Sequence, residues 1–78
     1  PYPLIIENMK FIVKMWGSDP LIFDIRLFDG FDRDGVNVYI CRVNNATFYF
    51  ESNADDEVWT ILDNAIYALK DFRKKEAS

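Results

Sequence analysis

The 78-residue sequence contains no histidine and one cysteine, Cys41. Without histidine, a Ser-His-Asp or Cys-His catalytic arrangement is excluded, and acid–base chemistry would require carboxylates, lysine, tyrosine or Cys41 with a shifted pKa. A lone cysteine cannot form an internal disulfide, and without histidine it does not supply the usual zinc ligand sets. At this length a single domain is expected, residues 1–78. Domains this small bury a modest share of their surface, so many gain stability from a partner.

Long hydrophobic runs and targeting signals are also missing. No apolar run approaches the length of about 18 residues that a membrane-spanning helix needs. The first 16 residues contain no small-residue cleavage site, and charges interrupt their apolar stretch, so no secretory signal is predicted. An unpaired cysteine without such a signal favours a cytoplasmic protein. Met9 followed by Lys10 would be a reasonable native start, which makes residues 1–8 a candidate leader or vector-derived extension.

Apolar residues, in contrast, make up half of the chain, and 13 residues are aromatic. They alternate with polar residues over 9–16, 21–28, 36–43 and 46–51, and a period of two predicts four strands. Residues 17–20 form a turn cluster, and residues 29–35, with two Asp-Gly steps, are predicted to be a loop. Asn44 and Asn45 suit a two-residue hairpin loop of type I′, because asparagine tolerates positive φ.

This hairpin predicts the register of the last two strands. If Val43 and Ala46 close the loop, the numbers of directly paired residues sum to 89. One face then carries Val43/Ala46, Cys41/Phe48 and Tyr39/Phe50, and the other carries Arg42/Thr47, Ile40/Tyr49 and Val38/Glu51. The first face is uniformly apolar, so Cys41 is expected to be a small buried residue of the core and not a nucleophile.

The last segment has helical periodicity. Ser52 or Asn53 is expected to cap it, three acidic residues (55–57) would occupy its first turn, and three basic residues (73–75) its last. Its apolar stripe is predicted to contain Val58, Leu62, Ala65, Leu69 and Phe72, widened by Trp59, Ile61 and Ile66. The predicted fold class is therefore α+β: a four-stranded antiparallel β-meander (residues 9–51), followed by one C-terminal amphipathic helix (residues 52–75) packed on one sheet face.

One helix covers one face of such a sheet, and the other face is unusually apolar for a solvated surface. It is expected to carry Ile12, Trp16, Ile22, Phe28, Val38, Ile40 and Tyr49, among the charged residues Lys10, Lys14, Asp24, Arg26, Arg42 and Glu51. A large exposed apolar patch usually marks an interface. A face-to-face or edge-to-edge homodimer is the simplest interface for a small domain. The alternative is that the stems of arginine and lysine shield each apolar side chain, or that the order of the strands separates these side chains.

The same face also suggests a platform for single-stranded nucleic acid. Trp16, Phe28 and Tyr49 could stack on bases, and four cations against two carboxylates give the face a local charge of +2. However, no aromatic motif of the RRM type is present, the order of strands and helix differs from that fold, and the whole chain carries −4. Nucleic acid is therefore the less favoured partner.

Acidic residues concentrate between Gly17 and Glu57. This stretch contains nine carboxylates and three arginines, so its net charge is −6. Such a stretch could attract a basic protein, including a nucleic-acid-binding enzyme, by presenting carboxylates in place of phosphates. The alternative is that turns and helix starts collect Asp and Asn regardless of function. The Asp32–Gly35 segment departs from a calcium loop, because Gly30 and Cys41 stand where ligands are needed, so a hairpin turn is predicted and no metal or cofactor.

No residue constellation predicts catalysis, because the adjacent carboxylates lie in predicted loops without the burial that separates pKa values. The favoured hypothesis is a non-enzymatic acidic module that binds a partner protein stoichiometrically, such as an inhibitor, an antitoxin or immunity-type protein, or a phage-type modulator of a host enzyme, and that forms a homodimer. The alternative is single-strand nucleic-acid binding by the aromatic and basic sheet face. The candidate partner-binding residues are Ile12, Trp16, Ile22, Phe28, Ile40, Tyr49, Asp32, Asp34, Asp55 and Asp56.

Overall fold

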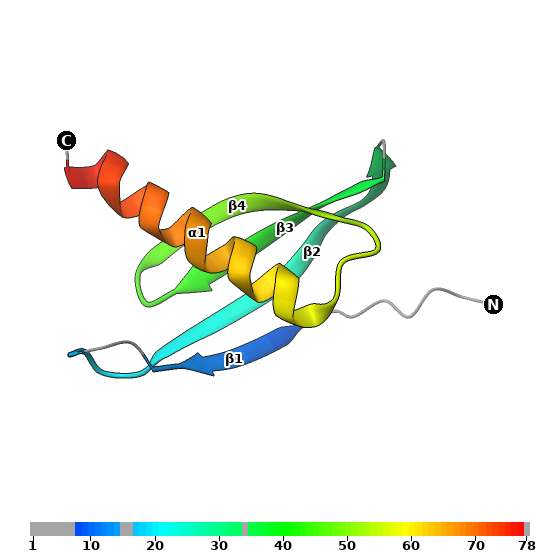
Figure 1. The fold of residues 1–78 in the computed structure, drawn as a ribbon. Helices are drawn as coiled ribbons and strands as arrows, with labels where there is room; N and C mark the ends of the chain where they lie inside the picture. The colour runs from blue at the N-terminus through cyan, green and yellow to red at the C-terminus, as the bar shows by residue number, and fades with distance from the viewer. Residues whose placement is uncertain (1–7, 15–16, 34, 78) are drawn as a thin grey trace.

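The structure, a computed structural model, describes residues 8–14, 17–33 and 35–77, except for the side chains of residues 29–33. Its elements are β1 (Met9–Val13), β2 (Leu21–Arg33), β3 (Val36–Val43), β4 (Ala46–Asn53) and α1 (Val58–Ala77). The strands form one antiparallel sheet in the order β1-β2-β3-β4, and α1 lies across one of its faces (Figure 1). The predicted α+β fold, a four-stranded meander followed by one helix, is confirmed.

The register of β3 and β4 is the predicted one, with Val43 opposite Ala46 and every following pair in step. Asn44 has φ 53°, so the loop has two residues and uses the tolerance of asparagine for this conformation. A type I′ turn needs positive φ at both central residues, whereas among the described non-glycine residues only Asn44 has it. The predicted turn type is therefore wrong, although the predicted pairing is confirmed.

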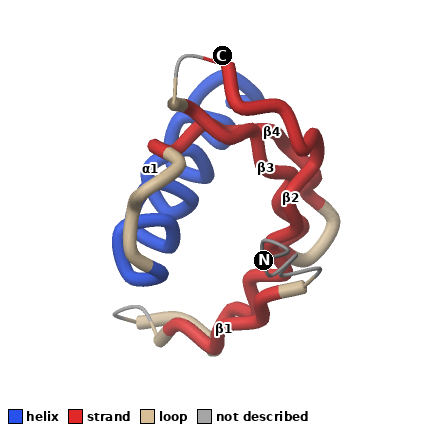
Figure 2. The backbone as a smooth tube through the Cα atoms, turned by 90° about the vertical axis from the view of Figure 1, so that its right-hand side faces the viewer, coloured by secondary structure: helices blue, strands red, loops and turns tan. Residues whose placement is uncertain are grey.

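β2 is longer than predicted. The segment 29–33, predicted to be a loop, continues the strand, with Asp29 opposite Val38 and Arg33 opposite Val36. The register shifts twice along this pairing, between Leu27 and Asp29 and again between Asp29 and Arg33. Extra residues on one strand bend and twist a sheet. Figure 2 shows the strands in an arc with α1 on its concave side.

The other strand bounds differ less from the prediction. β1 ends at Val13, because Lys14 lies outside the strand, and residues 15 and 16 lie outside the described part of the chain. β4 extends through Asn53, two residues past its predicted end. Neither difference changes the order of the strands or which parity of residues faces the helix.

The core lies between the concave face and α1, and its strand residues are those of the predicted apolar parity. Its buried members are Leu21, Phe23, Ile25, Tyr39, Cys41, Val43, Phe48, Phe50, Ile61, Leu62, Ala65 and Leu69. Ring stacking links the layers, since Phe48 of β4 packs on Phe72 of α1 with ring centroids 5.6 Å apart. Cys41 is fully buried, as predicted.

The helix starts later than predicted. α1 begins at Val58, and its first hydrogen bonds run from the N–H groups of Thr60 and Ile61 to the carbonyl of Glu57, 3.0 Å each. The acidic residues 55–57 therefore precede the helix, and its first turn contains no acidic residue. Ser52 and Asn53, the predicted caps, belong to β4.

Asp56 organises the connection from β4 to α1. Its carboxylate accepts hydrogen bonds from the Ser52 hydroxyl (2.5 Å) and from the Asn53 N–H (2.8 Å). The Ser52 oxygen in turn accepts a hydrogen bond from the Asn64 side chain of α1 (2.9 Å). Ser52 is buried, so this network satisfies a polar group inside the fold and holds the helix against the end of β4.

The buried stripe of α1 is narrower than predicted. Ile61, Leu62, Ala65 and Leu69 are buried, as the periodicity predicts. Val58 and Trp59, at the start of the helix, are largely exposed instead. The Trp59 ring contacts the Phe11 ring of β1, with centroids 6.3 Å apart. The first turn of α1 therefore lies at the margin of the core.

Candidate binding face

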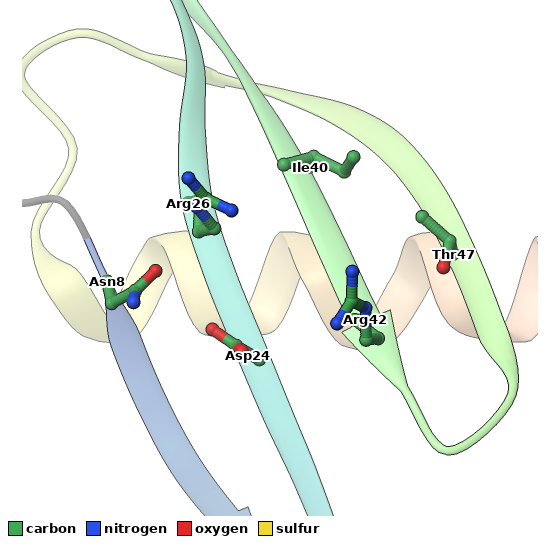
Figure 3. Close-up of a pocket in the computed structure, with 6 residues that line it drawn as sticks. All are labelled: Asn8, Asp24, Arg26, Ile40, Arg42 and Thr47. Atoms are coloured by element: carbon green, nitrogen blue, oxygen red, sulfur yellow. The ribbon is translucent and has the colours of Figure 1, made fainter.

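The convex face of the sheet, opposite α1, is called here the open face. It displays the even-numbered residues of β1, of β3 and of β2 as far as Phe28, together with the odd-numbered residues of β4. Figure 3 looks onto this face, with α1 passing behind the strands. Among the described residues, no strand or helix packs on it, and several of its large apolar side chains are exposed to solvent.

Two apolar groups stand on the open face. At one end, Ile12 of β1 is paired directly with Ile22 of β2, and their exposed fractions are 73% and 54%. At the other end, the rings of Phe28 and Tyr49 meet edge to face with centroids 4.9 Å apart. Ile40 of β3 is paired with Tyr49. We call Phe28, Ile40 and Tyr49 the aromatic corner.

Both rings of the aromatic corner are more than half exposed, at 57% for Phe28 and 58% for Tyr49. The edge-to-face contact fixes the orientation of each ring relative to the other. An exposed ring pair that is already ordered loses little conformational freedom on binding, so it is well suited to anchor a partner.

Four charged residues, Lys10, Asp24, Arg26 and Arg42, separate the two apolar groups and are called the polar band. Asp24 of β2 stands opposite Lys10 of β1 on one side and Arg42 of β3 on the other. A small hollow of about 80 Å³ opens beside it, lined by Asn8, Asp24, Arg26, Ile40, Arg42 and Thr47 (Figure 3). The Asp24 carboxylate points toward Asn8 in this view.

Asp24 Oδ1 is buried and has no hydrogen-bond donor among the described residues. No ion pair joins the charges of the polar band to one another. The ion pair of the described residues, between Lys75 and Asp71 at 3.2 Å, lies on the exposed surface of α1. The charges of the polar band are therefore neighbours without being paired in short contacts. Buried acceptors normally have a donor, so Asp24 Oδ1 is an exception among the buried side-chain polar atoms of the described residues.

Cys41 lies on the other side of the sheet and is paired with Ile25, next to Asp24 in β2. Burial raises the pKa of its thiol to about 12, and the nearby negative charge of Asp24 adds to the effect. At neutral pH the group is a neutral thiol, and the nucleophile in cysteine chemistry is the thiolate. The geometry gives Cys41 a packing role.

The structure brings five of the predicted site residues together on the open face: Ile12, Ile22, Phe28, Ile40 and Tyr49. Trp16 and Asp34 lie outside the described residues, and Asp32 belongs to β2 with no description of its side chain.

The acidic candidates Asp55 and Asp56 stand apart from this group, in the loop before α1. Asp55 is exposed, whereas Asp56 binds Ser52 and Asn53 and borders a hollow of about 200 Å³ beside Tyr39 and Ile61. The alternation of the sequence also predicts Asp24, Arg26 and Arg42 on the open face, although they are not among the candidate partner-binding residues.

Among the described residues, no three His, Cys, Asp or Glu side chains gather in a way that could hold a metal ion. Nor does this part of the chain contain a helix with the length and apolar character needed to cross a membrane. Comparison with protein-family models, with curated proteins and with solved structures finds no match for the chain.

Proposed function

We propose that this protein is a non-enzymatic module that binds a partner protein stoichiometrically through its open face, and that it does so as a homodimer. The observation that carries the proposal is the combination of two exposed apolar groups with the polar band between them. Large exposed apolar patches with polar surroundings are typical of interaction sites. An inhibitor, an antitoxin or immunity-type protein, or a phage-type modulator of a host enzyme would use such a surface.

The face also indicates the chemistry of its partner. A complementary surface would bury an apolar side chain against the aromatic corner and offer a hydrogen-bond donor to Asp24. It would also present acceptors or carboxylates to Arg26 and Arg42, because guanidinium groups bind carboxylates well. Since aromatic residues near the centre of an interface often carry much of the binding energy, Phe28 and Tyr49 are the expected anchors.

Overall charge adds a second, long-range contribution. The chain carries −4, and its acidic stretch would attract a basic protein such as a nucleic-acid-binding enzyme before contact is made. Because Asp55 and Asp56 lie away from the open face, this field would steer the encounter and the open face would make the contact. A cytoplasmic location fits the proposal, since Cys41 is a free thiol.

The test compares variants of the open face with a variant elsewhere. Ile22→Ser and Phe28→Ser remove exposed apolar groups of the face, and Tyr67→Ser removes a still more exposed ring on α1 (77% exposed) as the control. The full chain is used as bait in extract of its native host, and any retained protein is purified and titrated by calorimetry. We expect one partner, bound at a fixed ratio by wild type and Tyr67→Ser and at least about tenfold more weakly by both face variants. Equal binding by all four proteins would contradict the proposal.

A second candidate function is binding of single-stranded nucleic acid, and the exposed Phe28–Tyr49 pair beside Arg26 and Arg42 favours it. Bases could stack on the rings while the arginines contact phosphates. Fluorescence titration of a labelled oligonucleotide at low salt tests this function. Binding that falls steeply with salt, strengthens in Asp24→Asn and disappears in Phe28→Ser would favour the second candidate.

A further inference from the structure

The outer edge of β4 has backbone groups available for another strand. Because a two-residue loop joins Val43 to Ala46, this pair exchanges both backbone hydrogen bonds, and pairs of that kind then alternate along the ladder. The N–H and C=O groups of Thr47, Tyr49 and Glu51 consequently point away from β3. Among the described residues, no strand lies beside β4 on that side.

The last residue of β4 agrees with this assignment. The Asn53 N–H donates to the Asp56 carboxylate at 2.8 Å, and the Asn53 carbonyl accepts from the Asp56 N–H at 3.0 Å. Asn53 has the same parity as Tyr49, so the outward-pointing groups of the edge are satisfied at its end by Asp56. The remaining open segment contains three residues with free backbone groups.

Natural edge strands are usually protected by lysine, proline, a bulge or extreme shortness. β1 at the other edge has five residues and an exposed lysine, Lys10, with Lys14 directly after it. β4 has eight residues, contains no proline or lysine, and pairs with β3 without a register shift. Its edge is regular and contains none of these features, so it is suited to pair with another strand, while α1 packs against β4 from the concave face.

We propose that two copies of this chain pair antiparallel through β4, with the two-fold axis at Tyr49, and so form one continuous eight-stranded sheet with both helices on the same face. This inference depends on the homodimeric part of the proposed function and names its interface. In this register Tyr49 lies opposite Tyr49 of the second copy, and Thr47 lies opposite its Glu51. All three open residues of each edge then take part in pairs that exchange backbone hydrogen bonds, whereas an axis at Phe48 or Phe50 leaves one open residue of each copy without such a partner.

The side chains along the edge of β4 fit a second copy of this chain as the pairing strand. Glu51 meets Thr47 and not another carboxylate, so the pairing opposes no like charges. On the concave side, Phe48 meets Phe50 of the second copy and extends the apolar layer below the helices. On the convex side, the two aromatic corners become adjacent at the axis, so the dimer joins two anchors into one central binding patch.

Disulfide trapping tests both the dimer and its register in the full chain. Paired residues of this kind have Cα atoms about 5.5 Å apart, within the span of a disulfide. Tyr49→Cys should therefore cross-link to a covalent dimer under mild oxidation. Thr47→Cys, whose equivalent residue in the second copy lies more than about 13 Å away, should not. Wild type is the control, since its Cys41 is buried.

A backbone block provides the second measurement. Tyr49→Pro removes an N–H that β3 does not use, and proline is tolerated at such edge positions. Sedimentation over about a hundredfold range of concentration should give a dimer for wild type and Tyr49→Ala and a folded monomer for Tyr49→Pro. A monomeric wild type would overturn this inference and the homodimeric part of the proposed function together. A dimer that cross-links equally through Thr47→Cys, or that survives Tyr49→Pro, would overturn the edge inference alone.

Discussion

The buried hydroxyl of Ser52 donates a 2.5 Å hydrogen bond to the carboxylate of Asp56, and this bond connects the end of β4 to the loop that leads into α1. Asn64 of α1 donates to the same hydroxyl. The helix is thus held to the sheet by a polar contact at one end and by ring stacking between Phe48 and Phe72 farther along.

Removing the Asp56 carboxylate should destabilise the protein. Asp56→Ala leaves the Ser52 hydroxyl and the Asn53 N–H without their acceptor, which we expect to lower the free energy of unfolding by about 1–3 kcal/mol. Asp55→Ala, an adjacent exposed carboxylate, is the control and should change it by less than about 0.5 kcal/mol. Urea denaturation followed by circular dichroism measures both. Equal losses would show that Asp56 acts through its charge and not through this network.

Leu69 and Tyr67 should differ sharply although they are two residues apart on α1. Leu69 is 1% exposed in the core, and Leu69→Ala is expected to cost about 2–5 kcal/mol of unfolding free energy through lost burial and a cavity. Tyr67 is 77% exposed, so Tyr67→Ala should cost less than about 0.5 kcal/mol. Thermal and urea unfolding of both variants check the orientation of the helix. A similar loss of stability at both positions would show that α1 does not pack against the sheet through the side that contains Leu69.

The positive φ of Asn44 predicts a position-specific effect in the β3–β4 loop. Asn44→Ala should destabilise the fold by about 1–2 kcal/mol, because alanine is disfavoured in this region of φ. Asn44→Gly should be close to wild type, since glycine adopts the conformation freely. Asn45→Ala is the matched control at the other loop position. If Asn45→Ala were the more costly change, the loop would have a different conformation.

The buried thiol of Cys41 predicts both slow chemistry and a pH effect. With its pKa raised to about 12, the native thiol should react with a disulfide reagent at pH 8 only as fast as the protein opens. The unfolded thiol ionises at lower pH than the folded one. The stabilising contribution is therefore present below a pH of about 9 and is lost as the pH rises toward 12.

Wild type should accordingly lose stability more steeply over this alkaline range than Cys41→Ala, which has no thiol to ionise. Thermal unfolding of both proteins at several pH values measures the difference. Parallel curves would contradict the raised pKa of Cys41.

Short-range signals predicted most of the sheet. The two-residue loop at Asn44 and Asn45 determines the whole β3–β4 register, because each pair follows from the one before it. The alternation of β2 separates Phe23 and Ile25, which are buried in the core, from Ile22 and Phe28 on the open face. The same reasoning failed after Leu27, where the register with β3 shifts and the period of two is broken. The Asp29-Gly30 step, of a kind that usually marks a turn, lies inside β2 in this protein.

The start of the helix was misplaced for a different reason. Three acidic residues before an apolar run usually occupy the first helical turn, where they favour the helix dipole. In this fold Asp56 instead satisfies the buried Ser52, and that contact depends on where β4 ends. Of the candidate site, the apolar and the charged members of the open face followed from parity alone. The unpartnered oxygen of Asp24 did not, because it depends on how three strands place their side chains.

Because β1 contributes little buried surface, it is expected to open before the other strands. None of the twelve buried core residues belongs to β1; Met9, Phe11 and Val13 are partly buried and pack against the core from outside. Stability within a fold is uneven, and strands with little buried area open locally at low cost. Amide protons of β1 that bond to β2 should therefore exchange with solvent much sooner than those of β3. Detachment of β1 would uncover an edge of β2 while the three-stranded remainder and α1 stay folded, so it is the stage at which β2 is most exposed to pairing with another chain.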